Sequence, residues 1–206
     1  MELDKCIIGR RAVRNFRDKD VSFKLVNDCL NAARHAPSAG NSQSWKFIVV
    51  RDKETKNRIV GLCEAHEWMS SAPVLVVACA DLHKIGKYYG ARGEALYAVQ
   101  NLAAAIQNML LKAYDLGMSS CWVGNFDEES LIRMLNIPSD ARPQAIVCLG
   151  YSNEEVEPTG REPLDNFVFF ESWGKREDKS RGVWPLGSRL DKMAGKLHEK
   201  VSRKKN

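Results

Sequence analysis

The stretch of residues 94–116 constrains the fold of this chain more than any other part of the sequence. Its apolar residues recur at intervals of three and four positions, the spacing of one face of an α-helix, and Gly117 supplies an end signal. Small residues occupy other faces of the same stretch, including Ala98, Ala104 and Ala105. A helix that is apolar or small over much of its circumference is buried on more than one side. We therefore expect a central helix that is also available for a subunit interface.

Helical and β-like segments alternate along the rest of the chain. Three further helices are expected: from Ser22 to the residue before Pro37, from a cap at Asp52 or Thr55 to about Ala65, and after a cap at Asp127. Runs rich in β-branched and aromatic residues predict strands at 45–50, 74–80, 119–124 and 145–151. The run at 74–80 is apolar throughout, which is typical of a strand buried on both faces. One more β-like run, at 166–171, stands apart from the others.

The length and charge pattern indicate one domain with a basic extension. We expect a domain over residues 1–174 and an extension over 175–206, with a helix at about 188–204. The extension holds eleven Lys or Arg and four Asp or Glu, whereas the rest of the chain holds 20 and 22. The net charge of +5 therefore comes from the tail. A basic run of this kind is usually a solvated helix face, so we expect no nucleic-acid partner.

Six cysteines, at positions 6, 29, 63, 79, 121 and 148, have neither metal-ligand nor redox-motif spacing. Cys79 and Cys148 lie inside apolar runs, which is typical of core thiols in a reducing compartment. Residues 1–9 show no signal peptide, and no apolar stretch approaches the roughly 18 residues that a membrane helix needs. We expect a cytoplasmic protein with no metal and no membrane contact.

Arg10, Arg11 and Arg14 place three guanidinium groups within about one helical turn. Arg10 and Arg14 would repel each other there at a cost of roughly 0.2–0.5 kcal/mol without a counter-charge. A phosphate suits such a cluster, because guanidinium groups bind it through paired hydrogen bonds. The alternative is that an acidic neighbour neutralises the cluster; the candidates are Glu2, Asp18 and Asp20. The cluster predicts a bound phosphate.

The loop at 36–45 gathers Pro, Gly, Ser, Asn and Gln between a predicted helix and a predicted strand. Taken alone, it fits an ordinary turn equally well. Its side chains can also donate and accept hydrogen bonds along the edge of a heterocyclic ring, and Pro37 and Gly40 shape a backbone that permits close approach. Together with the arginines, the loop fits one flat, phosphorylated ligand.

No side chain for nucleophilic or acid–base catalysis is apparent from the sequence. Gly86, Gly90 and Gly93 do not match the dinucleotide-binding pattern, and the sequence has neither a Gly-Lys-Ser/Thr phosphate loop nor a serine in a nucleophile elbow. The four histidines lack metal-ligand spacing. These features favour a cofactor that brings its own chemistry.

The sequence resembles the nitroreductase family of FMN-dependent oxidoreductases from about Cys6 to Glu171. Four ordered blocks carry the resemblance: 10–14, 36–45, 94–117 with 121–124, and 149–151 with 161–164. The resemblance implies an α+β fold, with a mixed central sheet flanked by helices, in an intertwined homodimer with C-terminal strand exchange. The run at 166–171 is then the strand that crosses to the partner, where it gives an edge strand a hydrogen-bonding neighbour.

The resemblance also implies which residues hold FMN. The first arginine block and Arg161 would bind the phosphate and ribityl chain from one subunit, and the loop of the other subunit would meet the isoalloxazine. The segment after residue 121 would line the far side of the ring and offer backbone donors near N5. No side chain is catalytic in this interpretation, because the flavin N5 carries the chemistry. The implied cofactor-binding residues are Arg10, Arg11, Arg14, Pro37, Ser38, Asn41, Gln43, Trp122, Val123, Gly124, Asn125 and Arg161.

The implied function is hydride transfer from NADH or NADPH, through FMN, to an oxidised aromatic acceptor such as a nitro compound or a quinone. Donor and acceptor would use one pocket in turn. A second hypothesis is a flavin-binding protein of the same fold that uses a protein electron donor or acts on the flavin itself. A third is a nucleic-acid-associated module that uses residues 175–206, against which the sparse aromatic content of the tail argues.

Overall fold

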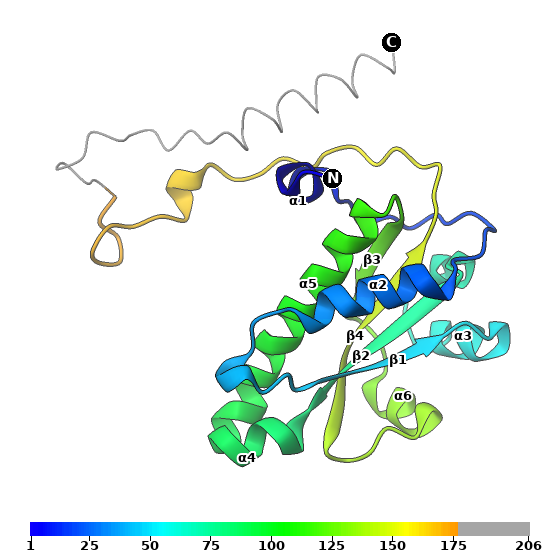
Figure 1. Cartoon of the computed structure of the whole chain (residues 1–206), viewed down its shortest axis with the longest axis horizontal. Coiled ribbons are helices and arrows are strands. Elements are labelled where there is room, and N and C mark those ends of the chain that lie inside the picture. The colour runs from blue at the N-terminus through cyan, green and yellow to red at the C-terminus, as the bar shows by residue number, and fades with distance from the viewer. Residues whose placement is uncertain (177–206) are drawn as a thin grey trace, which may run out of the picture. The chain divides into compact units, whose positions relative to one another are not determined.

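The computed structural model describes residues 1–176, which fall into two units (Figure 1). The first unit comprises Met1 and residues 10–155, and the second comprises residues 2–9 and those from 156 onward. The second unit contains helix α1 (Leu3–Gly9) and the short helix η4 (Leu164–Asn166). The expected helix at 188–204 lies outside the described residues, and the domain boundary at 174/175 stays a prediction.

Four antiparallel strands form the sheet of the first unit, in the order β1-β2-β4-β3. Their bounds are β1 (Trp45–Val50), β2 (Val74–Asp81), β3 (Ser119–Val123) and β4 (Ala141–Gly150). The four strands predicted between residues 45 and 151 are all present, and the α+β class is confirmed. Ala12 forms an isolated parallel bridge with Ser120 at the outer edge of β3, so the sheet also contains one parallel contact.

Strand β4 begins four residues before the predicted strand and includes Pro143. Proline lacks the N–H that a ladder requires, so it is normally confined to edges and bulges. The pairing of β2 with β4 shifts register between Ala78 and Cys79, and Cys79 pairs with Pro143. Gln144 is skipped in this pairing, so the bulge lies in β4, beside the proline through which the strand continues.

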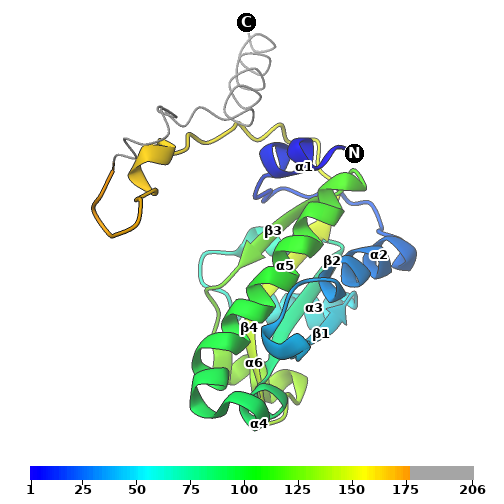
Figure 2. The ribbon, with the colours of Figure 1, turned by 60° about the vertical axis from the view of Figure 1, so that its left-hand side comes forward.

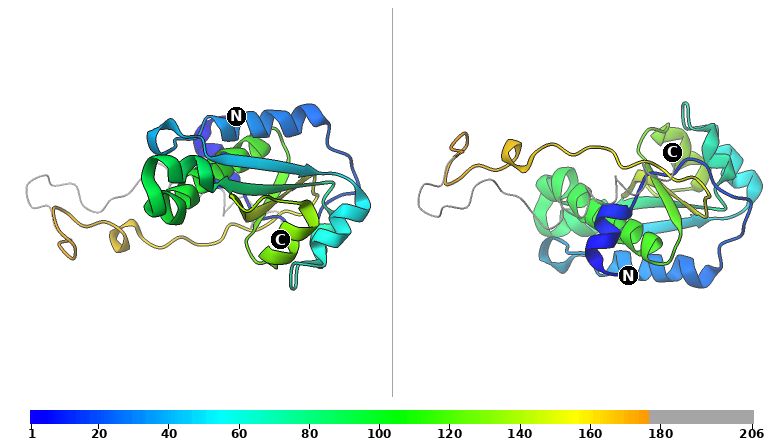
Figure 3. Two further views of the ribbon diagram at one scale, coloured as in Figure 1. Left: turned by 90° about the horizontal axis from the view of Figure 1, so that it is seen from below. Right: turned by 90° about the horizontal axis from the view of Figure 1, so that it is seen from above.

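Helices cover both faces of the sheet, as the views from below and from above in Figure 3 show. One face packs against α2 (Phe23–Arg34) and α5 (Ala98–Asp115), and the other against α3 (Lys53–Val60) and α6 (Glu128–Leu135). Alternate residues of β2 and β4 enter the two resulting cores, so both strands are buried on both faces, as predicted for 74–80.

Helix α5 lies along the sheet (Figure 2) and is the predicted central helix. It follows α4 (Leu82–Arg92) and a turn of π-helix (Gly93–Tyr97), so the expected helical stretch begins as a wider turn. At the other end, Gly117 has a φ of +74° and its N–H donates to the Tyr114 carbonyl over 3.0 Å. Leu102, Ile106 and Met109 are fully buried, whereas Val99 is 45% exposed. The helix is buried on the side of its own sheet and leaves an apolar flank at the surface.

One predicted helix end was wrong, and the strand expected at 166–171 through pairing with a partner chain stays a prediction. Helix α3 ends at Val60 instead of about Ala65, because Gly61 forms its C-cap and Ala65 adopts a left-handed φ of +57°. The run at 166–171 forms no strand; Leu164–Asn166 is a short helix and Phe167 is 64% exposed. A lone extended segment is not stabilised without a neighbouring strand.

All six cysteines are free thiols, and none of the described helices could span a membrane. Four of the cysteines, at positions 63, 79, 121 and 148, pack in the core between the sheet and helices α3 and α6. Burial raises the pKa of Cys63 and of Cys79 to about 11, so both thiols are neutral at pH 7. They act as small apolar residues, as the sequence predicts.

Gly150 provides a test of this packing. A Cβ at this position would lie 2.6 Å from Cδ1 of Phe16 and 2.7 Å from Cδ of Pro73. We expect Gly150→Ala to lower the free energy of unfolding by about 1–3 kcal/mol through overpacking, with a lower urea midpoint and an unchanged m-value. Gly61→Ala is the control, because its Cβ would make ordinary contacts at 3.5 Å. Equal midpoints for the two variants would contradict the packing described here.

Candidate functional site

The segment that carries the arginines runs along the outer edge of β3. The N–H of Val13 donates to the Ser120 carbonyl over 3.0 Å, and the N–H of Arg17 donates to the Tyr151 carbonyl over 2.7 Å. Val13 and Phe16 are buried. The segment is therefore fixed to the sheet through its backbone and two apolar anchors, while Arg14 lies on the exposed side.

Arg10 and Arg14 form no ion pair with any carboxylate among residues 1–176. Asp20, one of the acidic candidates, instead binds Arg51 over 2.6 Å. Arg14 lies with its guanidinium carbon 6.0 Å from the centre of the Trp68 ring. Burial raises the pKa of the Cys121 thiol, and the positive charges of Arg14 and Arg10 oppose that rise, which places both arginines beside β3. Their charge is left for a ligand to neutralise.

The two remaining predicted arginines differ from this pair. Arg11 donates from Nη1 to the carbonyl of Arg10 over 2.9 Å, so its guanidinium folds back onto the backbone. Arg161 belongs to the second unit, where it donates to the Thr159 hydroxyl over 2.7 Å and to the Gly160 carbonyl over 3.0 Å. The structure brings Arg10 and Arg14 together at β3 and leaves the roles of Arg11 and Arg161 as predictions.

The loop before β1 adopts an unusual backbone conformation. Gly40, Asn41 and Gln43 have φ values of +55°, +54° and +47°, a region that side-chain-bearing residues rarely occupy. The N–H of Gln43 donates to the Ser38 hydroxyl over 3.0 Å, and its Nε2 donates to Oδ1 of Asn41 over 3.1 Å. Three of the predicted ligand-edge residues thus form one hydrogen-bonded set, preceded by the exposed Pro37. Backbone strain of this kind clusters at ligand-binding sites.

Asn101 of α5 holds this loop, and the sequence analysis did not identify it. The residue is buried, and its carboxamide bonds to the backbone of Ala39 and to the hydroxyls of Ser42 and Ser44. These contacts span nearly 60 positions of sequence, so no local pattern signals them. The loop is consequently tied to the N-terminal half of α5.

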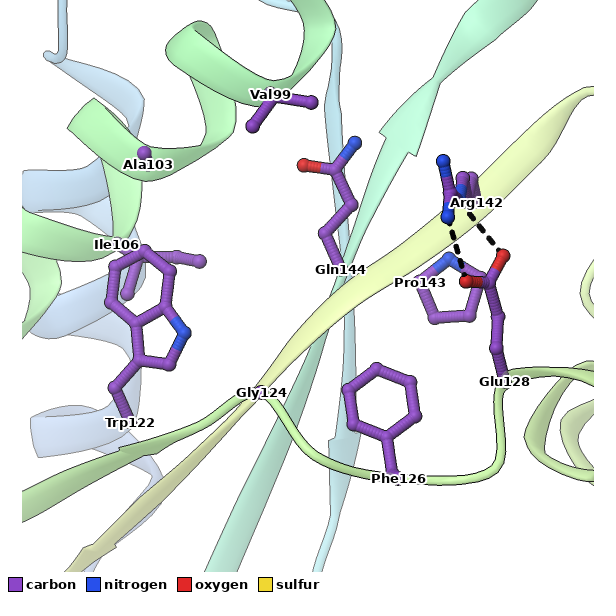
Figure 4. A pocket seen from close by; sticks show the side chains of 10 residues that line it. All are labelled: Val99, Ala103, Ile106, Trp122, Gly124, Phe126, Glu128, Arg142, Pro143 and Gln144. Atoms are coloured by element: carbon purple, nitrogen blue, oxygen red, sulfur yellow. Dashed lines mark hydrogen bonds and ion pairs between the residues drawn. The ribbon is translucent and has the colours of Figure 1, made fainter. Parts of the chain in front are cut away.

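A pocket of about 280 Å³ lies between α5, the end of β3 and β4 (Figure 4). Two of the predicted site residues, Trp122 and Gly124, line it. The side chain of Val123 points to the opposite face of the sheet and is buried there, so this residue can offer only backbone groups to a ligand. The structure adds further lining residues, which are Val99, Ala103, Ile106, Phe126, Glu128, Arg142, Pro143 and Gln144.

The polar groups of the pocket are largely neutral. Glu128 accepts two hydrogen bonds from Arg142, at 2.8 and 3.0 Å, so the charges of both residues are compensated (Figure 4). The carboxamide of Gln144 extends into the pocket between Val99 and Arg142. Apolar walls with a neutral amide suit a planar aromatic ring that has polar atoms on its edge. No cluster of three or more His, Cys, Asp or Glu side chains in the described part of the chain could hold a metal ion.

The arginine segment and the loop lie toward opposite ends of α5. The loop bonds to Asn101, whereas the arginine segment bonds to Ser120, just beyond the C-terminal end of the helix, where Met118 N–H donates to the Ala113 carbonyl. Asn101 and Ala113 are separated by about 18 Å along the helix axis. The arginines and the loop of one chain therefore do not surround a common point.

Comparisons with known proteins identify the family. The pattern of the "Nitroreductase family" matches residues 7–66 and 62–151. A protein of Archaeoglobus fulgidus, provisionally named NADH dehydrogenase/NAD(P)H nitroreductase, is 36% identical over 158 residues, covering 74% of this chain and 87% of that protein. The NADH dehydrogenase of Thermus thermophilus is 32% identical over 190 residues, covering 79% of this chain and 93% of that protein.

Solved structures agree with the sequence relatives. An FMN-dependent nitroreductase from Clostridium difficile R20291 superposes with a TM-score of 0.70 at 26% identity, covering 82% of this chain and 98% of that chain. The match includes the antiparallel sheet and its flanking helices, and the family pattern includes the arginine segment, the strained loop and β3. The chain belongs to the nitroreductase family.

Proposed function

We propose that the protein is an FMN-dependent oxidoreductase that takes electrons from NADH or NADPH and delivers them to an oxidised aromatic acceptor, such as a nitro compound or a quinone. The observation that carries the proposal is the pair Arg10 and Arg14, fixed beside β3 without a carboxylate partner among the described residues. The names of the Archaeoglobus, Thermus and Clostridium relatives support the donor and the cofactor.

The residues present fit FMN. Arg10 and Arg14 supply the cationic donors that a phosphate dianion needs, and Arg161 is proposed to join them. Asn41 and Gln43 present amide donors and acceptors to a ring edge, while Gly124 and Asn125 offer backbone groups at the end of β3. Reversible hydride transfer is the chemistry that FMN supplies when bound.

The protein's own part is to bind, orient and exclude water. Fixed backbone donors at the end of β3 would stabilise negative charge that develops on a reduced ring. The apolar part of the pocket wall, which includes Val99, Ile106 and Trp122, would contact a second ring beside the flavin. We propose that donor and acceptor occupy this space in turn, because the pocket is small and its polar groups are neutral.

We further propose a homodimer in which each site takes residues from both chains. The separation of the arginines from the loop along α5 supports this, since a partner's loop can then complete the site. An exposed apolar flank offers an interface; it comprises Leu96 of the preceding π-helical turn, Val99 of α5 and the neighbouring Trp122. The run at 166–171 is proposed to pair with the partner's sheet.

The phosphate-binding role of the arginines predicts a specific loss of affinity. We expect Arg14→Ala to weaken FMN binding by roughly ten-fold or more, because a charge-assisted hydrogen bond contributes about 1.5–3 kcal/mol. Riboflavin, which lacks the phosphate, should bind the variant and the wild-type protein equally. Fluorescence titration of both ligands measures this, with Arg17→Ala as control from the same segment. An equal loss for both ligands would refute the assignment.

The electron donor and acceptor can be tested on the flavin-loaded protein. We expect anaerobic NADH or NADPH to bleach the flavin absorbance within seconds, and a nitroaromatic compound or a quinone to restore it. Restoration by each acceptor separates the proposed class from a protein that merely stores flavin. Failure of both nicotinamides to bleach the bound flavin would reject the proposal and favour a protein electron donor.

The proposed interface makes Val99 sensitive to charge. We expect Val99→Asp to convert the dimer to a monomer in sedimentation experiments, because it buries a carboxylate in an apolar contact. FMN affinity should fall with the dimer, since the site draws on two chains. Asn31→Asp, at an exposed position of α2, adds the same charge and should leave both properties unchanged. A monomeric Val99→Asp protein with full FMN affinity would show that one chain suffices.

A further inference from the structure

Asn101 makes more contacts with the loop than its place in a helix requires. It is 4% exposed, and its Oδ1 accepts a hydrogen bond from the Ala39 N–H over 2.9 Å. Its Nδ2 donates to the hydroxyls of Ser42 and Ser44 over 3.2 and 3.0 Å. Ser42 and Ser44 are themselves buried, so these bonds replace contacts with water. One carboxamide thereby fixes the loop at three points.

The loop needs such an anchor because its backbone is unfavourable. Gly40, Asn41 and Gln43 are left-handed; glycine and asparagine tolerate this region, whereas the glutamine side chain disfavours it. The bonds of Gln43 to Ser38 and Asn41 align the side chains with one another but do not attach them to the rest of the protein. The attachment comes from the side chain of Asn101, together with the Asp81 N–H, which donates to the Ser44 carbonyl over 3.0 Å.

A second helix confines the opposite side of the loop. A Cβ at Gly40 would collide with the hydroxyl of Tyr89 on α4, so the two residues are in contact. Tyr89 packs edge-on against Tyr97, with ring centres 5.2 Å apart, and the Tyr97 hydroxyl accepts a hydrogen bond from Arg92 Nε over 3.1 Å. Asn101 and Tyr89 therefore both contact the loop, while the side chains of Asn41 and Gln43 are exposed.

We propose that Asn101 is a positioning residue for the cofactor: it sets the strained loop so that Asn41 and Gln43 meet the ring edge of the flavin. This inference rests on the proposed function, in which the loop contacts FMN. A carboxamide is suited to the task because it provides an acceptor for a backbone N–H and donors for two hydroxyls at once. Because Asn101 already orders the loop in the free protein, a ligand that binds to it loses less conformational entropy.

The test compares variants that remove these bonds in different ways. Asn101→Leu removes all three, and we expect about a ten-fold or greater rise in the dissociation constant of FMN. Asn101→Asp keeps the acceptor, and the serine hydroxyls can rotate to donate to it, so it should restore a substantial part of the affinity. The double variant Ser42→Ala with Ser44→Ala leaves Asn101 in place and serves if Asn101→Leu does not fold; its affinity should fall as well.

Asn108 provides the matched control on the same helix. Its Nδ2 donates to the Ala32 carbonyl of α2 over 3.2 Å and has no hydrogen bond to the loop. Asn108→Ala should lower the thermal midpoint yet leave FMN affinity within about two-fold of wild type. A shift of the flavin absorption maximum or reduction potential should appear in Asn101→Leu and not in Asn108→Ala.

A double-mutant cycle separates action through the loop from a general loss of stability. The effects of Asn101→Leu and Gln43→Ala on FMN affinity should be less than additive, whereas those of Asn101→Leu and Arg14→Ala should add. A folded Asn101→Leu protein with wild-type FMN affinity and spectrum would overturn this inference alone, provided that the wild-type protein binds FMN. A wild-type protein that does not bind FMN would overturn the proposed function and this inference together.

Discussion

The burial of α5 against β2 and β4 fixes the parts of the candidate site in relation to one another. Leu102, Ile106 and Met109 anchor the helix in the core, and the same helix presents Asn101 to the loop and Val99 to the pocket. A change in the rotation or height of α5 would therefore move the loop and the pocket wall together. Because close-packed interiors resist deformation, the helix keeps the loop and the pocket wall at a fixed separation.

The electrostatic arrangement follows from the sheet edge. The arginine segment is attached to β3 by a backbone hydrogen bond from Val13 to Ser120. The hydrogen-bond donors of its side chains are therefore not needed to attach it to the sheet. Asp20 is already engaged by Arg51, and the pocket cation Arg142 is neutralised by Glu128. Arg10 and Arg14 thus carry positive charge beside β3 that no carboxylate of the described residues compensates, while the charged pair in the pocket is neutral overall. This division suits a ligand with an anionic tail and an uncharged ring.

Much of the fold could be predicted because its signals are local. Apolar runs identified the strands, and the spacing at 94–116 identified α5. The extent of α3 and the course of β4 through Pro143 escaped prediction, because a glycine cap and a bulge at Gln144 of β4 decide them. The run at 166–171 has the residue pattern of a strand, but it belongs to none of the strand ladders of the described residues, so the pattern alone did not decide its structure.

The candidate site was predictable to the extent that its residues are adjacent in sequence. The arginine cluster and the loop were recognisable, whereas Asn101 and Gln144 are found only when the fold brings α5 and β4 to them. The orientation of Val123 follows from alternation along β3, since Cys121 and Val123 enter one core and Trp122 faces α5. Local sequence patterns indicate what kind of ligand a site can bind. Tertiary packing determines which other side chains hold the ligand-binding residues in place.

A crystal structure of the protein with FMN tests the account most directly. We predict two chains per assembly, with the phosphate between Arg10 and Arg14 of one chain and the ring edge against Asn41 and Gln43 of the other. Phosphate bound elsewhere, with those arginines paired to carboxylates and the loop of the partner distant from the ring, would contradict it.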